Sequence, residues 1–214
     1  MLLIKRIFDF VAAILGLILL SPVMLVTAVL VRLKMKGPIL FCQVRPGLYR
    51  RPFTLVKFRT MKNEHDADGN LLPDSERLTP LGFWLRASSL DELPQLWNVL
   101  KGELSLVGPR PLLMQYLDRY SVDQLRRLEV KPGITGWAQV NGRNAISWEE
   151  KFRLDVWYVD HWSLWLDVRI LWRTFWLILR REGISSSEHV TMPEFLGDFR
   201  RDAAGASAST HSRL

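Results

Sequence analysis

The feature that most constrains this chain is an apolar segment near its N-terminus. Residues 7–31 read IFDFVAAILGLILLSPVMLVTAVLV and are almost continuously apolar. About 20 such residues suffice to cross the hydrocarbon core of a bilayer, so the sequence predicts a membrane segment. A cleaved signal peptide with Val26–Ala28 as its cleavage site is one alternative. It is disfavoured, because the apolar run continues past that site and is followed by the basic residues Arg32, Lys34 and Lys36.

A simple spanning helix is the second alternative, and the flanking charges argue against it. Lys5 and Arg6 precede the run and further basic residues follow it, so both ends are expected to face the cytoplasm. Pro22 removes a backbone hydrogen bond and favours a kink, while the Ser21 hydroxyl can satisfy the freed carbonyl. The arm before this break extends only about 21 Å, short of the ~30 Å core. A hairpin-like re-entrant helix, with Asp9 at the headgroup level, fits these observations.

The C-terminal third carries a second membrane signature. Residues 156–181 read VWYVDHWSLWLDVRILWRTFWLILRR and place tryptophans among leucines before two final arginines. Tryptophan prefers the membrane interface, and amphipathic helices there carry basic residues on their polar face. A buried aromatic core is the alternative, but the N-terminal segment favours a helix lying on the membrane. The tryptophans concerned are Trp157, Trp162, Trp165, Trp172 and Trp176.

Between these ends the pattern alternates short strands and helices. Residues 38–61, PILFCQVRPGLYRRPFTLVKFRTM, predict two strands joined through residues 45–47, with Lys57 and Arg59 on one face. Two cations on one face can bind a diphosphate, although a solvated surface is the commoner reason for them. In the polar stretch that follows, Asp66-x-Asp68 resembles the metal-binding pair of many nucleotide-sugar transferases. We interpret it as a loop, because Gly69 and Asn70 make an ordinary turn equally well.

Two neighbouring carboxylates lie in the segment SLDELPQLWNV, residues 89–99. Ser89 and Glu92 have the spacing of a capping box, and Pro94 predicts that a helix begins between Asp91 and Leu93. Both carboxylates then lie at the positive end of the helix, which stabilises their ionised forms and also attracts phosphate groups. The segment alone therefore leaves two roles open, helix capping and anion chemistry.

Further polar residues follow this pair. Gly108-Pro109-Arg110-Pro111 predicts a stiff turn that presents one guanidinium for phosphate recognition, with a surface arginine as the alternative. Residues 131–144, KPGITGWAQVNGRN, lack the P-loop pattern but are compatible with an anion-binding loop that contains Lys131 and Arg143. Asp155 and Asp167 are candidates for metal ligation or for ordering arginines, with helix-surface charge as the alternative.

The chain contains, in order, the broken apolar segment, KFRTM, SLDELPQLWNVLKGELSLVGPRP, KPGITGWAQVNGRN and LDVWYV leading to Asp167. In this order the motifs resemble those of the small monotopic phosphoglycosyl transferases, the bacterial sugar transferase family. The resemblance extends from Lys5 to about Phe195. It implies an enzyme that transfers a sugar phosphate from a UDP-sugar to polyprenyl phosphate in the membrane and releases UMP. Similar enzymes begin the lipid-linked glycans of O-antigen, capsule, exopolysaccharide or glycoprotein.

The resemblance also implies roles for individual residues. Asp91 would be the nucleophile that forms an aspartyl-phosphosugar intermediate. Asp91 and Glu92 would bind the Mg²⁺ ion that similar enzymes use, and Arg110 would clamp a phosphate. The residues expected to bind substrate are Lys57, Arg59, Arg110, Lys131, Arg143, Asp155 and Asp167.

The expected architecture is a mostly helical α/β protein on the cytoplasmic face of the bacterial inner membrane. Residues 1–36 would form a re-entrant anchor, residues 37–199 a small catalytic domain with interfacial amphipathic helices, and residues 200–214 a disordered tail. The expected partners are the UDP-sugar, polyprenyl phosphate and membrane lipids, without nucleic acid, and a homo-oligomer remains open. One alternative is a metal-dependent glycosyltransferase that uses Asp66 and Asp68 and releases UDP. Another is a non-enzymatic adaptor whose +7 charge recruits nucleic acid or anionic lipid.

Overall fold

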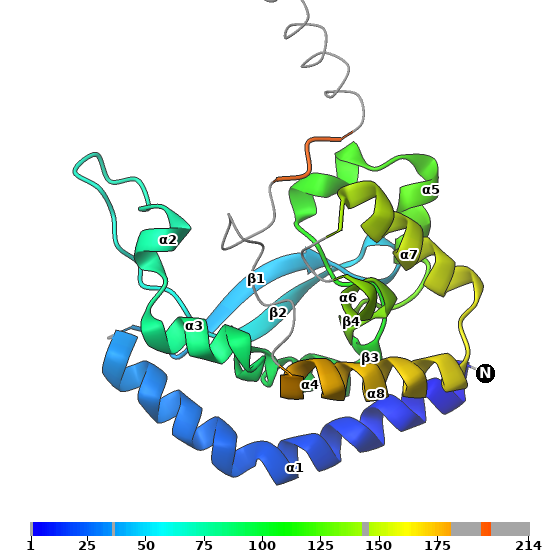
Figure 1. The fold of residues 1–214 in the computed structure, drawn as a ribbon, viewed down its shortest axis with the longest axis horizontal. Coiled ribbons are helices and arrows are strands. Elements are labelled where there is room, and N and C mark those ends of the chain that lie inside the picture. Colours follow the sequence, from blue (N-terminus) through cyan, green and yellow to red (C-terminus); the bar gives the residue numbers. More distant parts are fainter. Residues whose placement is uncertain (1, 36, 143–145, 181–193, 198–214) are drawn as a thin grey trace, which may run out of the picture.

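The structure is a computed structural model that describes residues 2–35, 37–142, 146–180 and 194–197, and its helices and strands form a small α/β domain above one long helix (Figure 1). The predicted class, α/β and mostly helical, agrees with this arrangement. In chain order the elements are α1 (Leu2–Met35), β1 (Leu40–Pro46), the 3-10 turn η1 (Leu48–Arg50), β2 (Pro52–Phe58), α2 (Asp74–Arg77), α3 (Pro80–Ala87), η2 (Leu90–Glu92), α4 (Gln95–Lys101), β3 (Ser105–Val107), η3 (Met114–Arg119), α5 (Val122–Leu125), η4 (Arg126–Leu128), β4 (Gly133–Thr135), α6 (Trp137–Asn141), α7 (Trp148–Asp160) and α8 (Leu164–Arg180).

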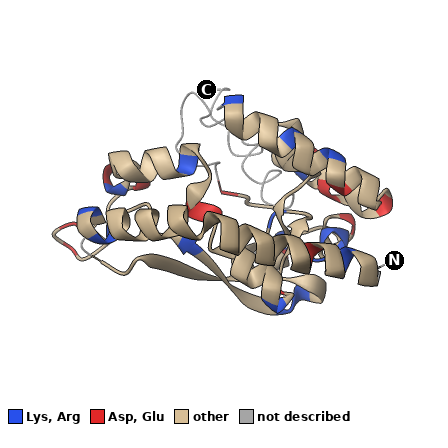
Figure 2. Ribbon diagram, turned by 90° about the horizontal axis from the view of Figure 1, so that it is seen from below, with Lys and Arg blue, Asp and Glu red and all other residues tan. Residues whose placement is uncertain are grey.

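Helix α1 underlies the domain and bends near its middle, so that its two arms slope up toward the domain (Figure 1). It stays one continuous helix, with Pro22 inside it, rather than forming a tight hairpin. Pro22 cannot donate to the carbonyl of Ile18, and the Ser21 hydroxyl donates to that oxygen at 2.8 Å, as predicted. By length and composition α1 is able to cross a membrane. Seen from below, its charged residues lie toward its two ends (Figure 2).

The first arm of α1 is fastened to the domain by its charged residues. The guanidinium of Arg6 donates to the carbonyls of Val99 and Leu100 at 2.5 and 2.6 Å and so caps the C-terminal end of α4. Asp9 is buried and accepts from the amide of Leu106 at 3.1 Å. Asp9 is thus enclosed by protein, and β3 supplies the hydrogen bond that water would otherwise give; its position at the headgroup level stays a prediction.

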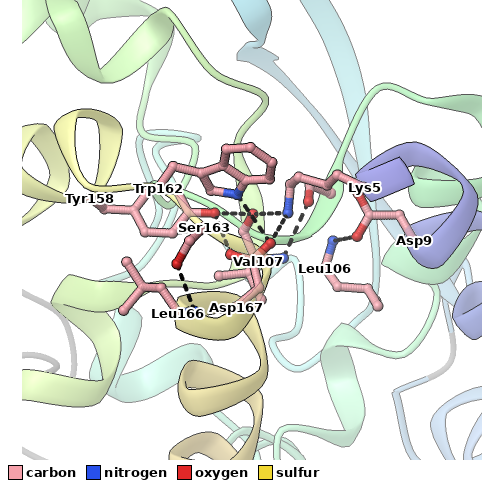
Figure 3. Close-up of polar contacts among 10 residues, drawn as sticks. Lys5, Asp9, Leu106, Val107, Tyr158, Trp162, Ser163, Leu166 and Asp167 are labelled. Atoms are coloured by element: carbon pink, nitrogen blue, oxygen red, sulfur yellow. Dashed lines mark hydrogen bonds and ion pairs between the residues drawn. The ribbon is translucent and has the colours of Figure 1, made fainter. Parts of the chain in front are cut away.

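Lys5 is held beside β3 by a polar cluster (Figure 3). Its Nζ donates to Asp167 Oδ2 at 2.5 Å and to the carbonyl of Val107 at 3.2 Å. Asp167 also accepts from the hydroxyl of Tyr158 at 2.7 Å and from the indole of Trp162 at 3.2 Å. The cluster therefore joins α1, β3, α7 and α8, which are far apart in the sequence.

The tryptophan-rich segment forms two helices, α7 and α8, that separate at residues 161–163. Helix α8 buries Leu166, Asp167 and Ile170 and exposes an apolar face. Trp162 instead binds Asp167, and Trp157 stacks on Trp137 with ring centroids 5.1 Å apart. The exposed face of α8 comprises Trp165, Val168, Trp172, Phe175, Trp176 and Leu179.

Strands β1 and β2 form an antiparallel hairpin within the predicted segment, but the turn comes later than predicted. The chain reverses over residues 47–51, where the amide of Gly47 donates to the carbonyl of Arg51 at 2.8 Å, and Arg45 belongs to β1. The buried amide of Asn98 on α4 donates to the carbonyl of Thr54 at 2.7 Å. This bond fixes α4, and with it the preceding turn η2, against β2.

Residues 131–144 do not form the expected anion-binding loop where the structure describes them. They form β4, which pairs in parallel with β3, and the short helix α6. The glycines permit close backbone contact instead: a Cβ atom on Gly136 would lie 2.2 Å from the carbonyl oxygen of Gly108. The amide of Gly133 donates to the carbonyl of Pro109 at 3.0 Å, which ties β4 to the Gly-Pro-Arg-Pro turn.

Candidate active site

A cavity of about 1130 Å³ lies between the hairpin, the turn η2, the Gly-Pro-Arg-Pro turn and helices α1 and α8. Alternate residues of β1 face it, as strand geometry requires: Phe41, Gln43 and Arg45. Seven of its described lining residues are Lys or Arg and five are Asp or Glu, so its surface suits an anionic ligand. The cavity therefore combines a charged region with an apolar wall.

The two neighbouring carboxylates of η2 both face this cavity but have different surroundings. Glu92 is held by two cations: Lys57 Nζ lies 2.6 Å from Oε1, and Arg110 Nη2 lies 2.5 Å from the same oxygen. Asp91 is buried, and within the described part of the chain no hydrogen bond or ion pair is made to its carboxylate. Glu92 is therefore fixed in place, whereas Asp91 is available for a ligand.

The same surroundings separate the pKa values of the pair. Burial, with the negative charge of Glu92 next to it, raises the pKa of Asp91 to about 6. The charges of Arg110 and Lys57 outweigh burial at Glu92 and hold its pKa well below the usual range. The expectation that the helix start stabilises the ionised form of both carboxylates is therefore wrong for Asp91, because burial raises its pKa more than the helix end lowers it.

The backbone before the pair also differs from the prediction. Ser89 has φ 56° and ψ 17°, in the left-handed region, and its side chain makes no capping hydrogen bond. The capping box is therefore wrong, because an N-cap residue normally has extended backbone angles and Ser89 does not. A left-handed non-glycine residue costs about 1 kcal/mol or more. Helix α4 begins at Gln95, just after the predicted start, and Asp91 and Glu92 belong to the 3-10 turn before it.

Arg110 is positioned by a buried arginine that sequence reasoning missed. Arg127 Nη2 donates to the carbonyl of Arg110 at 2.7 Å and to Asp155 Oδ2, also at 2.7 Å. Both side chains of the Arg127–Asp155 pair are almost fully buried, so the helix-surface alternative for Asp155 is excluded. Of the roles considered, ordering an arginine is the one that this geometry matches.

The predicted substrate-binding residues fall into three groups. Lys57, Arg59, Arg110 and Asp155 line the cavity with Asp91 and Glu92. Asp167 lies outside the lining, in the cluster that binds Lys5, and Lys131 lies beside Arg6 instead. Arg143 lies outside the described residues, as does the predicted tail at residues 200–214.

Sequence reasoning missed three further arginines of the cavity wall, Arg45, Arg77 and Arg86. Arg86 on α3 donates to the hydroxyl of Thr60 at 3.0 Å. Its positive charge offsets part of the rise in the pKa of Asp91 that burial causes. Arg45 on β1 lies near Arg110 and interacts electrostatically with it. Strand alternation from Gln43 could have placed Arg45 on the cavity side of β1. It was not applied to Arg45, because residues 45–47 were predicted to form the turn.

The aspartates of the rival metal site lie elsewhere. Asp66 Oδ1 accepts from the amides of Asp68 and Asn70 at 3.0 and 2.8 Å, which makes an ordinary exposed turn, as predicted. Neither aspartate lines the cavity. Across the residues that the structure describes, no group of three or more acidic, histidine or cysteine side chains is arranged to hold a metal ion.

Comparison with known proteins decides the family. Residues 1–181 match the family model described as bacterial sugar transferase. The chain belongs to the bacterial sugar transferase family. It is 62% identical over 193 residues to the uncharacterized sugar transferase EpsL of Bacillus subtilis, covering 90% of this chain and 96% of that protein.

Longer members of the family have more specific names. The chain is 40% identical to the undecaprenyl-phosphate galactose phosphotransferase of Salmonella typhimurium, covering 84% of this chain and 41% of that protein. It is 43% identical to the UDP-glucose:undecaprenyl-phosphate glucose-1-phosphate transferase of Xanthomonas campestris, covering 78% of this chain and 37% of that protein. Membership of a sugar transferase family makes the chain an enzyme and overturns the non-enzymatic adaptor.

Proposed function

We propose that this enzyme transfers a sugar 1-phosphate from a UDP-sugar to polyprenyl phosphate and releases UMP. The observation that carries the proposal is the asymmetry of the carboxylate pair: Asp91 is buried, unpartnered and beside cations, whereas its neighbour Glu92 is clamped by Lys57 and Arg110. The names of the relatives from Salmonella and Xanthomonas supply the acceptor, and the latter also supplies a UDP-sugar donor.

Asp91 is the proposed nucleophile. Its Oδ forms a bond to the phosphorus that carries the sugar, the bond from that phosphorus to the bridging oxygen breaks, and UMP leaves with the electron pair. An oxygen of polyprenyl phosphate then forms a bond to the same phosphorus and displaces the Asp91 carboxylate. The pKa of about 6 leaves Asp91 mostly ionised at neutral pH, so the attack needs no separate base. Lys57 and Arg110 lie where they can stabilise the phosphate oxygens.

The carboxylate pair also fits a Mg²⁺ ion. Magnesium is usually bound by one or two carboxylates together with substrate phosphates and water, so a third acidic ligand is not needed. Among the described residues, the carboxylate of Asp91 has no hydrogen-bond partner, and Glu92 Oε2 accepts a single hydrogen bond, from Arg110 Nη1 at 3.3 Å. These two residues would hold the ion, which supplies charge neutralisation between the attacking carboxylate and the diphosphate.

The apolar wall of the cavity suits the lipid acceptor. It is formed by Gly16 and Leu20 of α1 and by Leu171, Leu177 and Ile178 of α8, which are among the lining residues. We propose that α1 is re-entrant and that the exposed tryptophans of α8 lie at the interface on the cytoplasmic face of the inner membrane. The active site would then meet a water-soluble donor and the phosphate of a membrane lipid at the headgroup level.

Product analysis with an Asp91 variant tests this function. Wild-type protein in lipid nanodiscs, given a panel of UDP-sugars and polyprenyl phosphate, should release UMP. Without the lipid acceptor it should accumulate a sugar-phosphate adduct on the peptide that contains Asp91, and adding acceptor should remove the adduct. Asp91→Asn should bind nanodiscs normally and produce neither UMP nor adduct.

Asp66→Asn is the matched control, because it makes the same chemical change in an exposed turn whose hydrogen bonds asparagine can keep. It should release UMP at the wild-type rate. Release of UDP by the wild type, with loss of activity in Asp66→Asn, would establish the metal-dependent glycosyltransferase instead. Turnover by Asp91→Asn close to wild type would remove Asp91 from the chemistry.

A further inference from the structure

Arg45 is a partly buried cation of the cavity wall that has no carboxylate partner among the residues the structure describes. Its Nη2 donates to the amide oxygen of Gln43 at 2.6 Å. Its Nε is buried and lacks a hydrogen-bond partner within the described part of the chain. Lys57 and Arg110, by contrast, both pair with Glu92. Arg45 is therefore in a position that would ordinarily be costly for a guanidinium.

The backbone directs Arg45 into the cavity. Phe41, Gln43 and Arg45 occupy alternate positions of β1, and all three line it. The register places Phe41 opposite Lys57 and Arg45 opposite Phe53, so Arg45 enters the cavity farther along the hairpin than Lys57 does. The hairpin thus presents two cations to one cavity from different points.

The hairpin register locates Arg45 relative to the carboxylate pair. Lys57 binds Glu92, the neighbour of Asp91, and lies opposite Phe41. Arg45 is four positions farther along β1 than Phe41, toward the turn, so it enters the cavity farther from the carboxylate pair than Lys57 does. The charge of Arg110 influences the pKa of both Arg45 and Asp91.

Burial and the neighbouring Arg110 lower the pKa of Arg45 to about 10, so the guanidinium remains charged at neutral pH. A second buried cation next to Arg110 is unfavourable until an anion binds between or beside them. A planar guanidinium with an unpartnered Nε is suited to bidentate phosphate binding, since Nε and a terminal nitrogen donate in parallel.

We propose that Arg45 binds the phosphate that remains with the nucleotide when the donor is cleaved. The proposal rests on the proposed function, because it assumes that Asp91 attacks the sugar-bearing phosphorus of a UDP-sugar. Arg110 would contact the diphosphate near the reacting phosphorus, and Arg45 the nucleotide phosphate beyond it. When the bond to the bridging oxygen breaks, the electron pair stays on UMP, and Arg45 stabilises this added charge without moving a proton.

The test separates the two half-reactions. In nanodiscs, Arg45→Gln should weaken UMP binding by about 10- to 100-fold and slow adduct formation from UDP-sugar at low concentration by a similar factor. The adduct, once formed and freed of nucleotide, should react with polyprenyl phosphate at the wild-type rate, because UMP has already left. Arg51→Gln is the matched control: it removes the same charge from an exposed position of the same hairpin, and it should change neither step.

If Arg45→Gln does not fold, Arg45→Lys provides a second test of the proposal. It retains the charge but loses the parallel donors, so UMP binding should still weaken by about tenfold. Unchanged UMP affinity in both variants would overturn the assignment, and so would a slowed reaction of the adduct with polyprenyl phosphate, which would assign Arg45 to the lipid phosphate. Failure of the wild type to release UMP would instead overturn the proposed function, so the two failures are distinguishable.

Discussion

Arg110 donates hydrogen bonds from both terminal nitrogens of its guanidinium to the carboxylate of Glu92. Nη2 lies 2.5 Å from Oε1, and Nη1 lies 3.3 Å from Oε2. The pairing places a planar fork next to Asp91 and leaves one edge of the guanidinium toward the cavity. It explains why the two adjacent carboxylates of η2 behave differently, since one is neutralised by cations and the other is not.

Arg110→Lys tests this fork. Lysine keeps the positive charge but makes one contact with Glu92 instead of two, so we expect UMP release to fall by about tenfold or more. Initial rates at saturating and low UDP-sugar would show whether the loss is in turnover or binding. Arg153→Lys is the control, because Arg153 is exposed and pairs only locally with Glu150. A rate within about twofold of wild type would show that a point charge suffices at position 110.

The raised pKa of Asp91 predicts a pH-dependent difference in stability between wild type and Asp91→Asn without added Mg²⁺. The folded protein binds a proton on Asp91 more tightly than the unfolded chain does, so this residue favours folding below about pH 4. That contribution is lost as the pH rises through about 6. Asp91→Asn should therefore be more stable at pH 7.5 by about 1–3 kcal/mol and gain little at pH 4.

Thermal unfolding in nanodiscs at the two pH values would measure this difference. The comparison subtracts the contributions of all other titrating groups, because only Asp91 differs. An Asp91→Asn protein that is less stable than wild type at pH 7.5 would contradict the prediction and indicate a structural role for the charge.

The buried pair of Lys5 and Asp167 predicts a strong dependence of stability on both partners. Asp167→Asn or Lys5→Met alone leaves one charge buried without its counter-ion and should destabilise the protein by about 3–5 kcal/mol. The double variant removes both charges and should recover part of that loss. The unfolding midpoint in nanodiscs measures each effect. Additive losses in the double variant would mean that the two side chains act independently.

The bend at Pro22 predicts the topology of α1. A cysteine at Leu3, with Cys42 replaced by serine, should resist a membrane-impermeant thiol reagent applied to intact cells, because both ends of a re-entrant helix face the cytoplasm. Adding Pro22→Ala should allow a straight helix of 34 residues, about 51 Å long, and so favour a spanning form that is labelled from outside. Labelling without that substitution would show that α1 already spans the membrane.

Several features could be read from the sequence because they depend on local chemistry. An apolar run of this length has to leave water, Pro22 has to break the hydrogen-bond ladder, and the Ser21 hydroxyl is close enough to satisfy the carbonyl of Ile18. Strand alternation predicted the hairpin, and the stiff Gly-Pro-Arg-Pro turn predicted that Arg110 would be presented at a defined position. The motifs in order were sufficient to identify the family.

Other features were decided only by tertiary structure, because they depend on which residues meet across the chain. Burial next to Glu92 raised the pKa of Asp91, although its place near a helix start suggested the opposite. Lys5 pairs with Asp167, 162 residues away, and the sequence pattern of each was equally compatible with a surface charge. The unpaired Nε of Arg45 likewise emerged only when β1 and Arg110 were brought to one cavity, since the free energy of a charge is set by its solvation and its neighbours in space.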